Sequence, residues 1–131
     1  MLKSTLLKTS TALAAVVAVF ATSLPVADAN AAGIRLVCEK SANRSKVSVD
    51  GNNLVAGNYV AKIRSGSNVK RSAPKATIGD EVEFDFDSDP GDVAAGATRI
   101  KRNFIQGPVS AELINERGFT VAKTSRACRT K

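Results

Sequence analysis

The sequence predicts an all-β fold, a small two-sheet antiparallel β-sandwich of about seven strands. Three observations indicate this class. Apolar and polar residues alternate over short runs, which is the period of a half-buried strand. Turn-forming Gly, Asn and Asp separate these runs at intervals of about 8–15 residues. Two cysteines, Cys38 and Cys128, lie near the first and the last of these strands, which a disulfide between them would join.

The expected architecture is immunoglobulin-like or fibronectin-III-like, because short strands with regular turn signals are typical of such sandwiches. This is a prediction of architecture and not of family. The chain has no Trp for the usual core of immunoglobulin domains. Its two cysteines are also too far apart in sequence for the inter-sheet bridge of those domains.

The N-terminus has the features of a secretory signal peptide. Lys3 and Lys8 give it a positive start, and an uncharged apolar run covers residues 12–21. Small residues then form two A-x-A patterns that end at Ala29 and Ala31. Together these features predict cleavage after one of those two alanines. The alternative is an uncleaved membrane anchor, although a membrane span needs about 20 strongly apolar residues.

We therefore expect a signal peptide over residues 1–29 and one β-sandwich domain over residues 32–131, which matches the usual size of a single domain. The protein is expected to be exported, periplasmic or secreted in a bacterium, with no membrane span in the mature chain. In an oxidising compartment Cys38 and Cys128 are expected to pair, and two independent buried thiols are the alternative. A redox role is not expected, because the chain has no C-x-x-C arrangement.

Three strands are expected in the first half of the domain. In residues 34–39, apolar side chains that face inward alternate with side chains that face outward, two of which are charged. Residues 47–49 are expected to form the second strand, because a tight-turn signal follows them at 50–51. Residues 59–64 alternate in the same way, and a turn-forming run at 65–68 ends them.

The second half contains the clearest strand, residues 81–87, in which three apolar residues face one side and four acidic residues face the other. A shorter strand is expected near residues 76–78. Residues 109–115 and 119–128 are expected to form a hairpin around a polar turn at 116–118, where Gly supplies the positive φ.

The segment 92–103 is the one helix candidate. Asp92 could cap a helix, and three apolar residues of the segment share one helical face. Gly96 in the middle disfavours a continuous helix. A long crossing loop with at most one helical turn is expected here.

Charge is distributed in three blocks along the chain. Overall, 19 Lys and Arg residues face 12 Asp and Glu, which gives a formal net charge of +7. Residues 30–79 hold nine basic and two acidic residues, and residues 93–131 hold eight basic and two acidic residues. Between them, residues 80–92 hold seven acidic residues and no basic ones. One acidic strand and turn therefore lies within an otherwise basic protein.

The acidic block has two interpretations. The first is a calcium site, because hard carboxylate oxygens on a turn suit Ca²⁺. Its four candidate ligands follow the pattern D-x-D-x-D-P-G-D and are Asp85, Asp87, Asp89 and Asp92. The second is a solvated outer strand face, whose charges prevent edge-to-edge pairing or meet basic neighbours across the sheet. Calcium is the one cofactor that the sequence suggests, and otherwise none is expected.

The basic residues also have two interpretations. If they converge in space they form an anion-binding surface, and otherwise they form a diffuse basic surface that aids solubility. The candidate anion-binding residues are Lys62, Arg64, Lys70, Arg71, Arg99, Lys101 and Arg102. The expected partner is an anionic envelope component, a glycan or another protein. Specific nucleic-acid recognition is not expected, because Tyr59 alone is a poor base-stacking platform.

The absence of His excludes imidazole-based acid–base catalysis, Ser-His-Asp and Cys-His nucleophile systems, and zinc sites that need imidazole. The protein is therefore not expected to be an enzyme. The alternative is a small hydrolase that uses Asp85 and Asp87 as a carboxylate pair. The expected function is that of an exported, non-enzymatic module with a binding or cell-envelope structural role, and a calcium-stabilised extracellular module is the first alternative.

Overall fold

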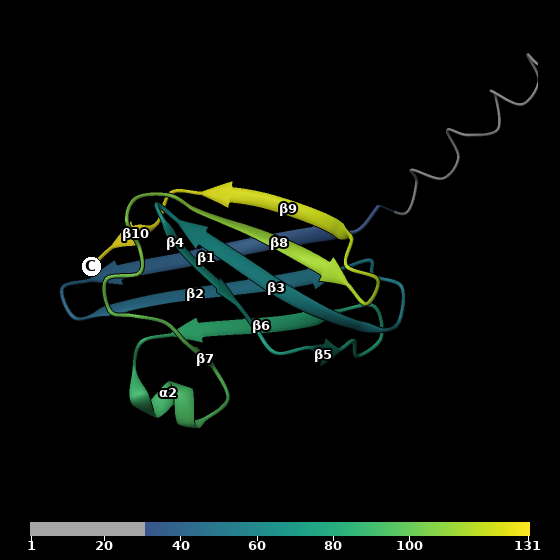
Figure 1. The fold of residues 1–131 in the computed structure, drawn as a ribbon, viewed down its shortest axis with the longest axis horizontal. Coiled ribbons are helices and arrows are strands. Elements are labelled where there is room, and N and C mark those ends of the chain that lie inside the picture. Colours follow the sequence, from purple (N-terminus) through teal and green to yellow (C-terminus); the bar gives the residue numbers. More distant parts are fainter. Residues whose placement is uncertain (1–30) are drawn as a thin grey trace, which may run out of the picture. The chain divides into compact units, whose positions relative to one another are not determined.

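Alternating side chains on ten strands build two packed sheets in the computed structural model, which describes residues 31–131 (Figure 1). The predicted β-sandwich is confirmed. Residues Ala32–Lys131 form one compact unit. The predicted signal peptide lies outside the described residues.

The first sheet, sheet A, has the strand order β10-β1-β2-β6-β7. Its three long strands pair antiparallel, while the two-residue strands β7 and β10 pair in parallel with β6 and β1. Its strands are β1 (Gly33–Ser41), β2 (Arg44–Asn52), β6 (Val82–Asp87), β7 (Thr98–Arg99) and β10 (Arg129–Thr130).

The second sheet, sheet B, has the order β4-β3-β8-β9, and all of its pairs are antiparallel. The short strand β5 pairs with the start of β3. Its strands are β3 (Asn58–Ser65), β4 (Asn68–Arg71), β5 (Lys75–Ala76), β8 (Val109–Asn115) and β9 (Thr120–Arg126). The predicted hairpin of the last two long strands is confirmed.

The core lies between the two sheets, where the inward residues of each strand meet. Sheet A contributes Val47, Val49, Phe84 and Phe86, and sheet B contributes Ala61, Ile63, Val109, Ala111 and Leu113, all nearly or fully buried. The apolar residues of β6 therefore face the core, as predicted. Burial of this apolar area supplies the main driving force for packing the sheets together.

The predicted tight turn at 50–51 is wrong, because β2 continues through both residues to Asn52. Gly51 is a strand residue whose missing side chain makes room for the opposite sheet. A Cβ at Gly51 would lie 2.5 Å from Cδ1 of Leu113. The glycine therefore reports a close approach between sheets rather than a turn.

The helix candidate reduces to α2 (Pro90–Ala94), a five-residue helix that starts earlier than predicted. Its N-cap is Asp89 and not Asp92, because the Asp89 side chain accepts a hydrogen bond from the Asp92 backbone N–H. Pro90 follows the cap in the first turn, a position that suits proline. The rest of the segment is the expected crossing loop, apart from β7.

The predicted disulfide between Cys38 and Cys128 is confirmed, with 4.8 Å between the two Cα atoms. It ties β1 to the chain just before β10, on the side of the sandwich where β1 lies against β9. The guanidinium of Arg126 also donates to the Leu36 carbonyl oxygen there, at 3.4 Å. One side of the sandwich is therefore closed covalently, and the opposite side, between β4 and β7, is left for the crossing loop.

Candidate functional site

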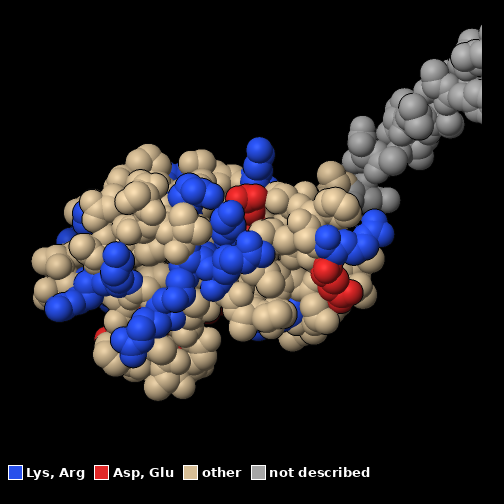
Figure 2. Space-filling model, in the orientation of Figure 1, with Lys and Arg blue, Asp and Glu red and all other residues tan. Residues whose placement is uncertain are grey.

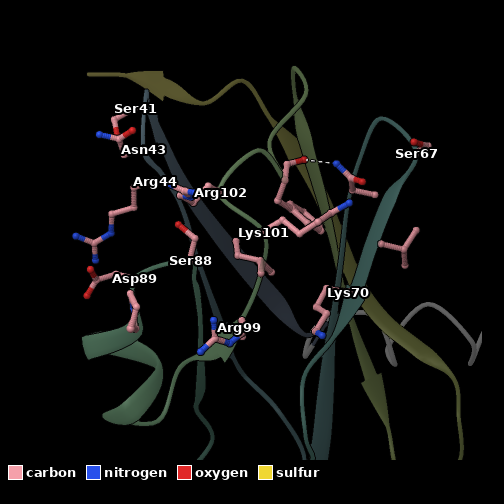
Figure 3. Close-up of a pocket in the computed structure, with 15 residues that line it drawn as sticks. Ser41, Asn43, Arg44, Ser67, Lys70, Ser88, Asp89, Arg99, Lys101 and Arg102 are labelled. Atoms are coloured by element: carbon pink, nitrogen blue, oxygen red, sulfur yellow. Dashed lines mark hydrogen bonds between the residues drawn. The ribbon is translucent and has the colours of Figure 1, made fainter.

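An open groove of about 1190 Å³ lies between β4 and the segment around β7 (Figure 3). β4 contributes one wall, and the segment that follows β7 contributes another. The β1–β2 turn and the start of α2 complete it. The charged and polar residues that line this groove are Ser41, Asn43, Arg44, Ser67, Asn68, Lys70, Ser88, Asp89, Arg99, Lys101 and Arg102.

Strand pairing explains why Lys70 lines the groove. Lys70 lies opposite Ile63 in the β3–β4 pair, and Ile63 points into the core. Lys70 therefore projects from the inner face of sheet B, at its edge, where the groove opens. Its neighbour Arg71 lies opposite Lys62 and projects from the other face.

β7 and the segment after it present three cations and bury the apolar residues beside them. Ile100 and Phe104 are almost completely buried, whereas Arg99, Lys101 and Arg102 are exposed. This in–out order places the three basic side chains on the groove side of the segment (Figure 3). Burial of the apolar residues thus fixes where the cations are displayed.

Hydrogen bonds hold the backbone of this segment in place. The Ile100 N–H donates to the Asp87 carbonyl oxygen at 3.0 Å. The buried Ser45 hydroxyl donates to the Arg102 carbonyl oxygen at 2.7 Å, and the Asn68 amide donates to the Phe104 carbonyl oxygen at 2.8 Å. The basic segment is therefore tied to both sheets, to β2 and β6 on one and to β4 on the other.

The remaining predicted anion-binding residues lie on the outer face of sheet B. Lys62 on β3 is paired with Arg71 on β4, so the two side chains share this face, and Arg64 follows two residues later. Lys123 on β9 lies in the same cross-strand row, beyond Glu112 on β8. Figure 2 shows Lys and Arg side chains gathered in a band across one face of the molecule.

We call the seven predicted cations together the basic surface: Lys62, Arg64 and Arg71 on the outer face of sheet B, and Lys70, Arg99, Lys101 and Arg102 in the groove. Within residues 31–131, none of the seven forms an ion pair with a carboxylate. β4 joins the two parts, because consecutive residues of one strand point to its two faces.

Other basic residues have partners elsewhere. Arg129 and Lys131 both form ion pairs with Glu39, at 3.5 Å. Lys75 donates to the Glu83 carbonyl oxygen at 2.7 Å. These side chains therefore do not join the basic surface.

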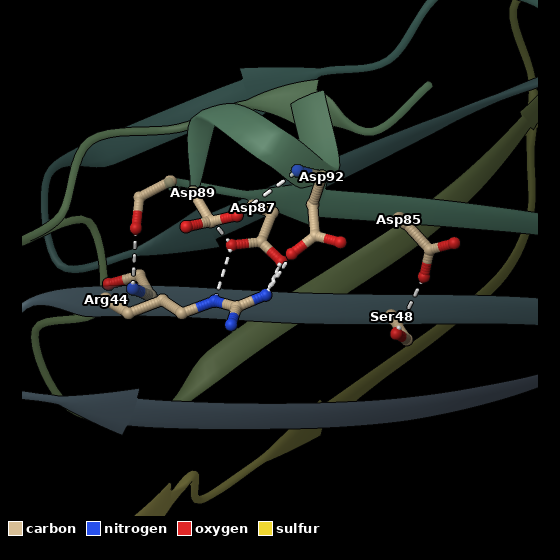
Figure 4. Close-up of polar contacts among 8 residues, drawn as sticks. Arg44, Ser48, Asp85, Asp87, Asp89 and Asp92 are labelled. Carbon is tan, nitrogen blue, oxygen red and sulfur yellow. Dashed lines mark hydrogen bonds and ion pairs between the residues drawn. The ribbon is translucent and has the colours of Figure 1, made fainter. Parts of the chain in front are cut away.

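The acidic block is organised around Arg44 (Figure 4). The Arg44 Nε donates to Oδ1 of Asp87 at 2.9 Å, and its Nη2 donates to Oδ2 of Asp87 at 2.6 Å. The same Nη2 also contacts Asp92. This two-pronged pairing neutralises Arg44, although Arg44 lines the groove.

Asp87 is only 2% exposed, so the alternation that predicts a solvated outer face is wrong at this position. Burial by itself would raise the pKa of Asp87. Hydrogen bonds from Arg44 and from the Asp89 backbone N–H outweigh that effect and lower the pKa of Asp87 below its ordinary value. The hydrogen bond with Asp87 in turn raises the pKa of Arg44. Both groups are therefore charged at neutral pH.

The four candidate calcium ligands have separate roles in the structure. Asp87 and Asp92 bind Arg44, Asp89 caps α2, and Asp85 accepts a hydrogen bond from the Ser48 hydroxyl at 2.9 Å. Among the described residues, no group of three or more acidic, His or Cys side chains is placed to hold a metal ion. The proposed catalytic pair is also divided between an ion pair and a hydroxyl contact.

Sequence reasoning did not identify Arg44 as the partner of the acidic block, because the two are 43 residues apart in the chain. It also left out Lys123, whose place on the outer face depends on the β8–β9 register. Alternation within β9 relates Lys123 only to other residues of its own strand, so no sequence signal could have placed it in one row with Lys62 on β3.

Comparison with protein-family models, with curated proteins and with solved structures finds no match for this chain. Within the part of the chain that the structure describes, no helix is long and apolar enough to cross a membrane.

Proposed function

We propose that this chain is an exported, non-enzymatic β-sandwich protein that binds a polyanion through the basic surface. One observation carries the proposal: seven cations from two distant parts of the sequence gather around β4, and none forms an ion pair with a carboxylate within residues 31–131. Cations that gather on one surface raise its positive potential and the local concentration of anionic ligands.

The acidic block does not cancel the basic surface. Two of its carboxylates are bound by Arg44, and Asp85 on β6 belongs to sheet A, on the outer face opposite to that of sheet B. Separation of opposite charges on one molecule produces a positive potential on one side, which attracts anionic ligands and speeds their association.

The disulfide supports export, because disulfides persist in oxidising compartments such as the periplasm or the extracellular medium. The topology supports an immunoglobulin-like architecture. The long strands β1, β2 and β6 lie in sheet A, and the long strands β3, β8 and β9 lie in sheet B. The chain therefore passes from one sheet to the other between β2 and β3, as it does in immunoglobulin-like sandwiches.

The test is retention on immobilised heparin, with elution by a salt gradient. The wild-type protein should bind at low salt and elute as a single peak, because salt weakens polyanion binding in proportion to the number of charges engaged. The Arg71→Gln/Arg99→Gln variant removes one cation from each part of the basic surface and should elute at clearly lower salt.

The matched control is Arg35→Gln/Lys46→Gln, which removes the same charge from exposed positions on sheet A. It should elute close to the wild type. Equal shifts for the two double variants would indicate a diffuse charge effect and contradict the proposal. Wild-type protein that fails to bind heparin at low salt would contradict it outright.

A further inference from the structure

The groove has the size and shape to accept part of an extended ligand. Its volume of about 1190 Å³ exceeds the usual range of small-molecule pockets, roughly 300–1,000 Å³. It lies between the edges of two sheets rather than inside the core, and it is open to solvent, so an extended ligand can reach it. A single small anion would contact only a fraction of this space.

Charge in the groove is strongly positive. Lys70 projects from β4, and Arg99, Lys101 and Arg102 project from the facing segment (Figure 3). The one carboxylate among the lining residues, Asp89, is engaged in capping α2. Four cations that form no ion pair among residues 31–131 therefore face one carboxylate, which favours a ligand that carries several negative charges along its length.

The uncharged lining indicates which kind of polyanion fits. Five hydroxyl or amide side chains line the groove beside four apolar residues: Ser41, Asn43, Ser67, Asn68 and Ser88, with Val69, Pro90, Ile100 and Phe104. The hydroxyl and amide groups match the hydroxyl-rich surface of a sugar chain. The aromatic residue that lines the groove, Phe104, is only 2% exposed, so a nucleic-acid base would find no stacking face there.

A membrane surface fits less well than a glycan. A bilayer is broad and cannot enter a groove between two sheet edges. The most exposed large apolar side chains, which could insert into lipid, are Val55, Ile78 and Phe119, none of which lines the groove. Val69 on β4, which is less exposed, is the one exposed large apolar residue in the groove lining among residues 31–131. Val55 and Phe119 follow the ends of β2 and β8, whereas the groove contains Arg44 at the beginning of β2. The apolar loops therefore lie at the opposite end of the strands.

We propose that the groove is the primary binding site for a linear anionic glycan, an inference that rests on the proposed function and assigns its ligand class. The fixed backbone of β7 and of the segment after it holds three of the cations in position before the ligand arrives, which limits the entropy lost on binding. A longer glycan continues over β4, from Lys70 in the groove to Arg71 and Lys62 on the outer face of sheet B.

Isothermal titration at low salt tests this inference with a heparin tetrasaccharide and with full-length heparin. The Arg99→Gln/Lys101→Gln variant should weaken tetrasaccharide binding by about tenfold or more. The Lys62→Gln/Arg64→Gln variant should weaken full-length heparin more than the tetrasaccharide. The Arg35→Gln/Lys46→Gln control should stay within about twofold of the wild type for both probes. All six positions lie on the surface, and circular dichroism spectra confirm that each variant is folded.

Two further probes separate glycans from other polyanions. Oligothymidylate of matched charge and vesicles of phosphatidylglycerol should both bind more weakly than heparin. Equal or tighter binding of either probe would overturn the glycan assignment while the proposed function stands. Equal losses from the groove pair and the outer-face pair with the tetrasaccharide would overturn the groove as the primary site. Absence of binding to all of these polyanions would instead contradict the proposed function itself.

Discussion

At the scale of single residues, the buried carboxylate of Asp87 joins the acidic block to sheet A. Its two oxygens receive the Arg44 guanidinium and the Asp89 N–H, and α2 starts directly after this contact. A buried charge without such partners would be costly, and a paired one is held firmly. The sequence pattern predicts the direction in which Asp87 points but not its burial, because Arg44 and α2 cover it only in the folded molecule.

We expect the Asp87→Asn variant to lower the free energy of unfolding by about 1–3 kcal/mol at neutral pH, because it removes a charged hydrogen-bond acceptor. The native pKa of Asp87 lies below its ordinary value, so its ionised form stabilises the fold above about pH 4. That stabilisation is lost as pH falls through the native pKa. The difference between variant and wild type should therefore shrink at acidic pH.

Urea unfolding at several pH values measures this difference. Asp85→Asn is the control, because Asp85 is exposed and its side chain contacts the Ser48 hydroxyl. The control should change stability by less than about 0.5 kcal/mol. A difference between Asp87→Asn and wild type that stays constant down to the acid transition would show that the charge of Asp87 is not responsible.

Millimolar calcium or a chelator should leave the melting temperature unchanged. The oxygens of Asp87 and Asp92 already bind Arg44, so a calcium ion would have to displace a guanidinium to reach them. A specific ion at about 100 times its Kd would add about 2.7 kcal/mol, which raises the melting temperature of a domain of this size by several degrees. Such a rise, if Asp92→Asn abolished it, would restore the calcium interpretation.

At the scale of elements, long alternating strands were predictable and short edge strands were not. β6 and the β8–β9 hairpin carry their alternation over six or seven residues, enough for the period to be recognised. β7 and β10 have two residues each, and only their neighbours in the sheet make them strands. The groove was equally unpredictable, because it depends on which edge of sheet B lies beside which edge of sheet A.

The segment after β7 should lose its position if Ser45 loses its hydroxyl. Ser45 is fully buried, donates to the Arg102 carbonyl oxygen and accepts from the Ile105 N–H at 3.4 Å. The Ser45→Ala variant should be destabilised by about 1–3 kcal/mol, because two buried backbone groups lose their partner. It should also elute from heparin at lower salt, although no charge has been removed.

Ser48→Ala is the matched control, because the Ser48 hydroxyl lies on the same strand and contacts the exposed Asp85. Its heparin elution should equal that of the wild type. If Ser45→Ala is destabilised but elutes with the wild type, then the anchoring of the segment does not contribute to ligand binding.

At the scale of the whole molecule, the sandwich is closed on one side and open on the other. The disulfide and the Arg126 contact hold β1 beside the end of β9, while the basic surface extends around β4 on the far side. Composition and cysteine count were sufficient to predict the closed side, because an exported domain with two cysteines usually pairs them. The open side required the register of both sheets.

This division predicts that the disulfide stabilises the fold without forming part of the binding site. The Cys38→Ser/Cys128→Ser variant should lose about 2–5 kcal/mol of unfolding free energy, because the bridge closes a loop between residues 90 apart in sequence. Reduced wild-type protein should show the same loss in urea unfolding. At a temperature where the variant is still folded, its heparin elution should match that of the wild type, since the cations around β4 keep their positions. A folded variant with impaired heparin binding would contradict this prediction, because it would show that the disulfide at β1 affects the positions of the cations around β4.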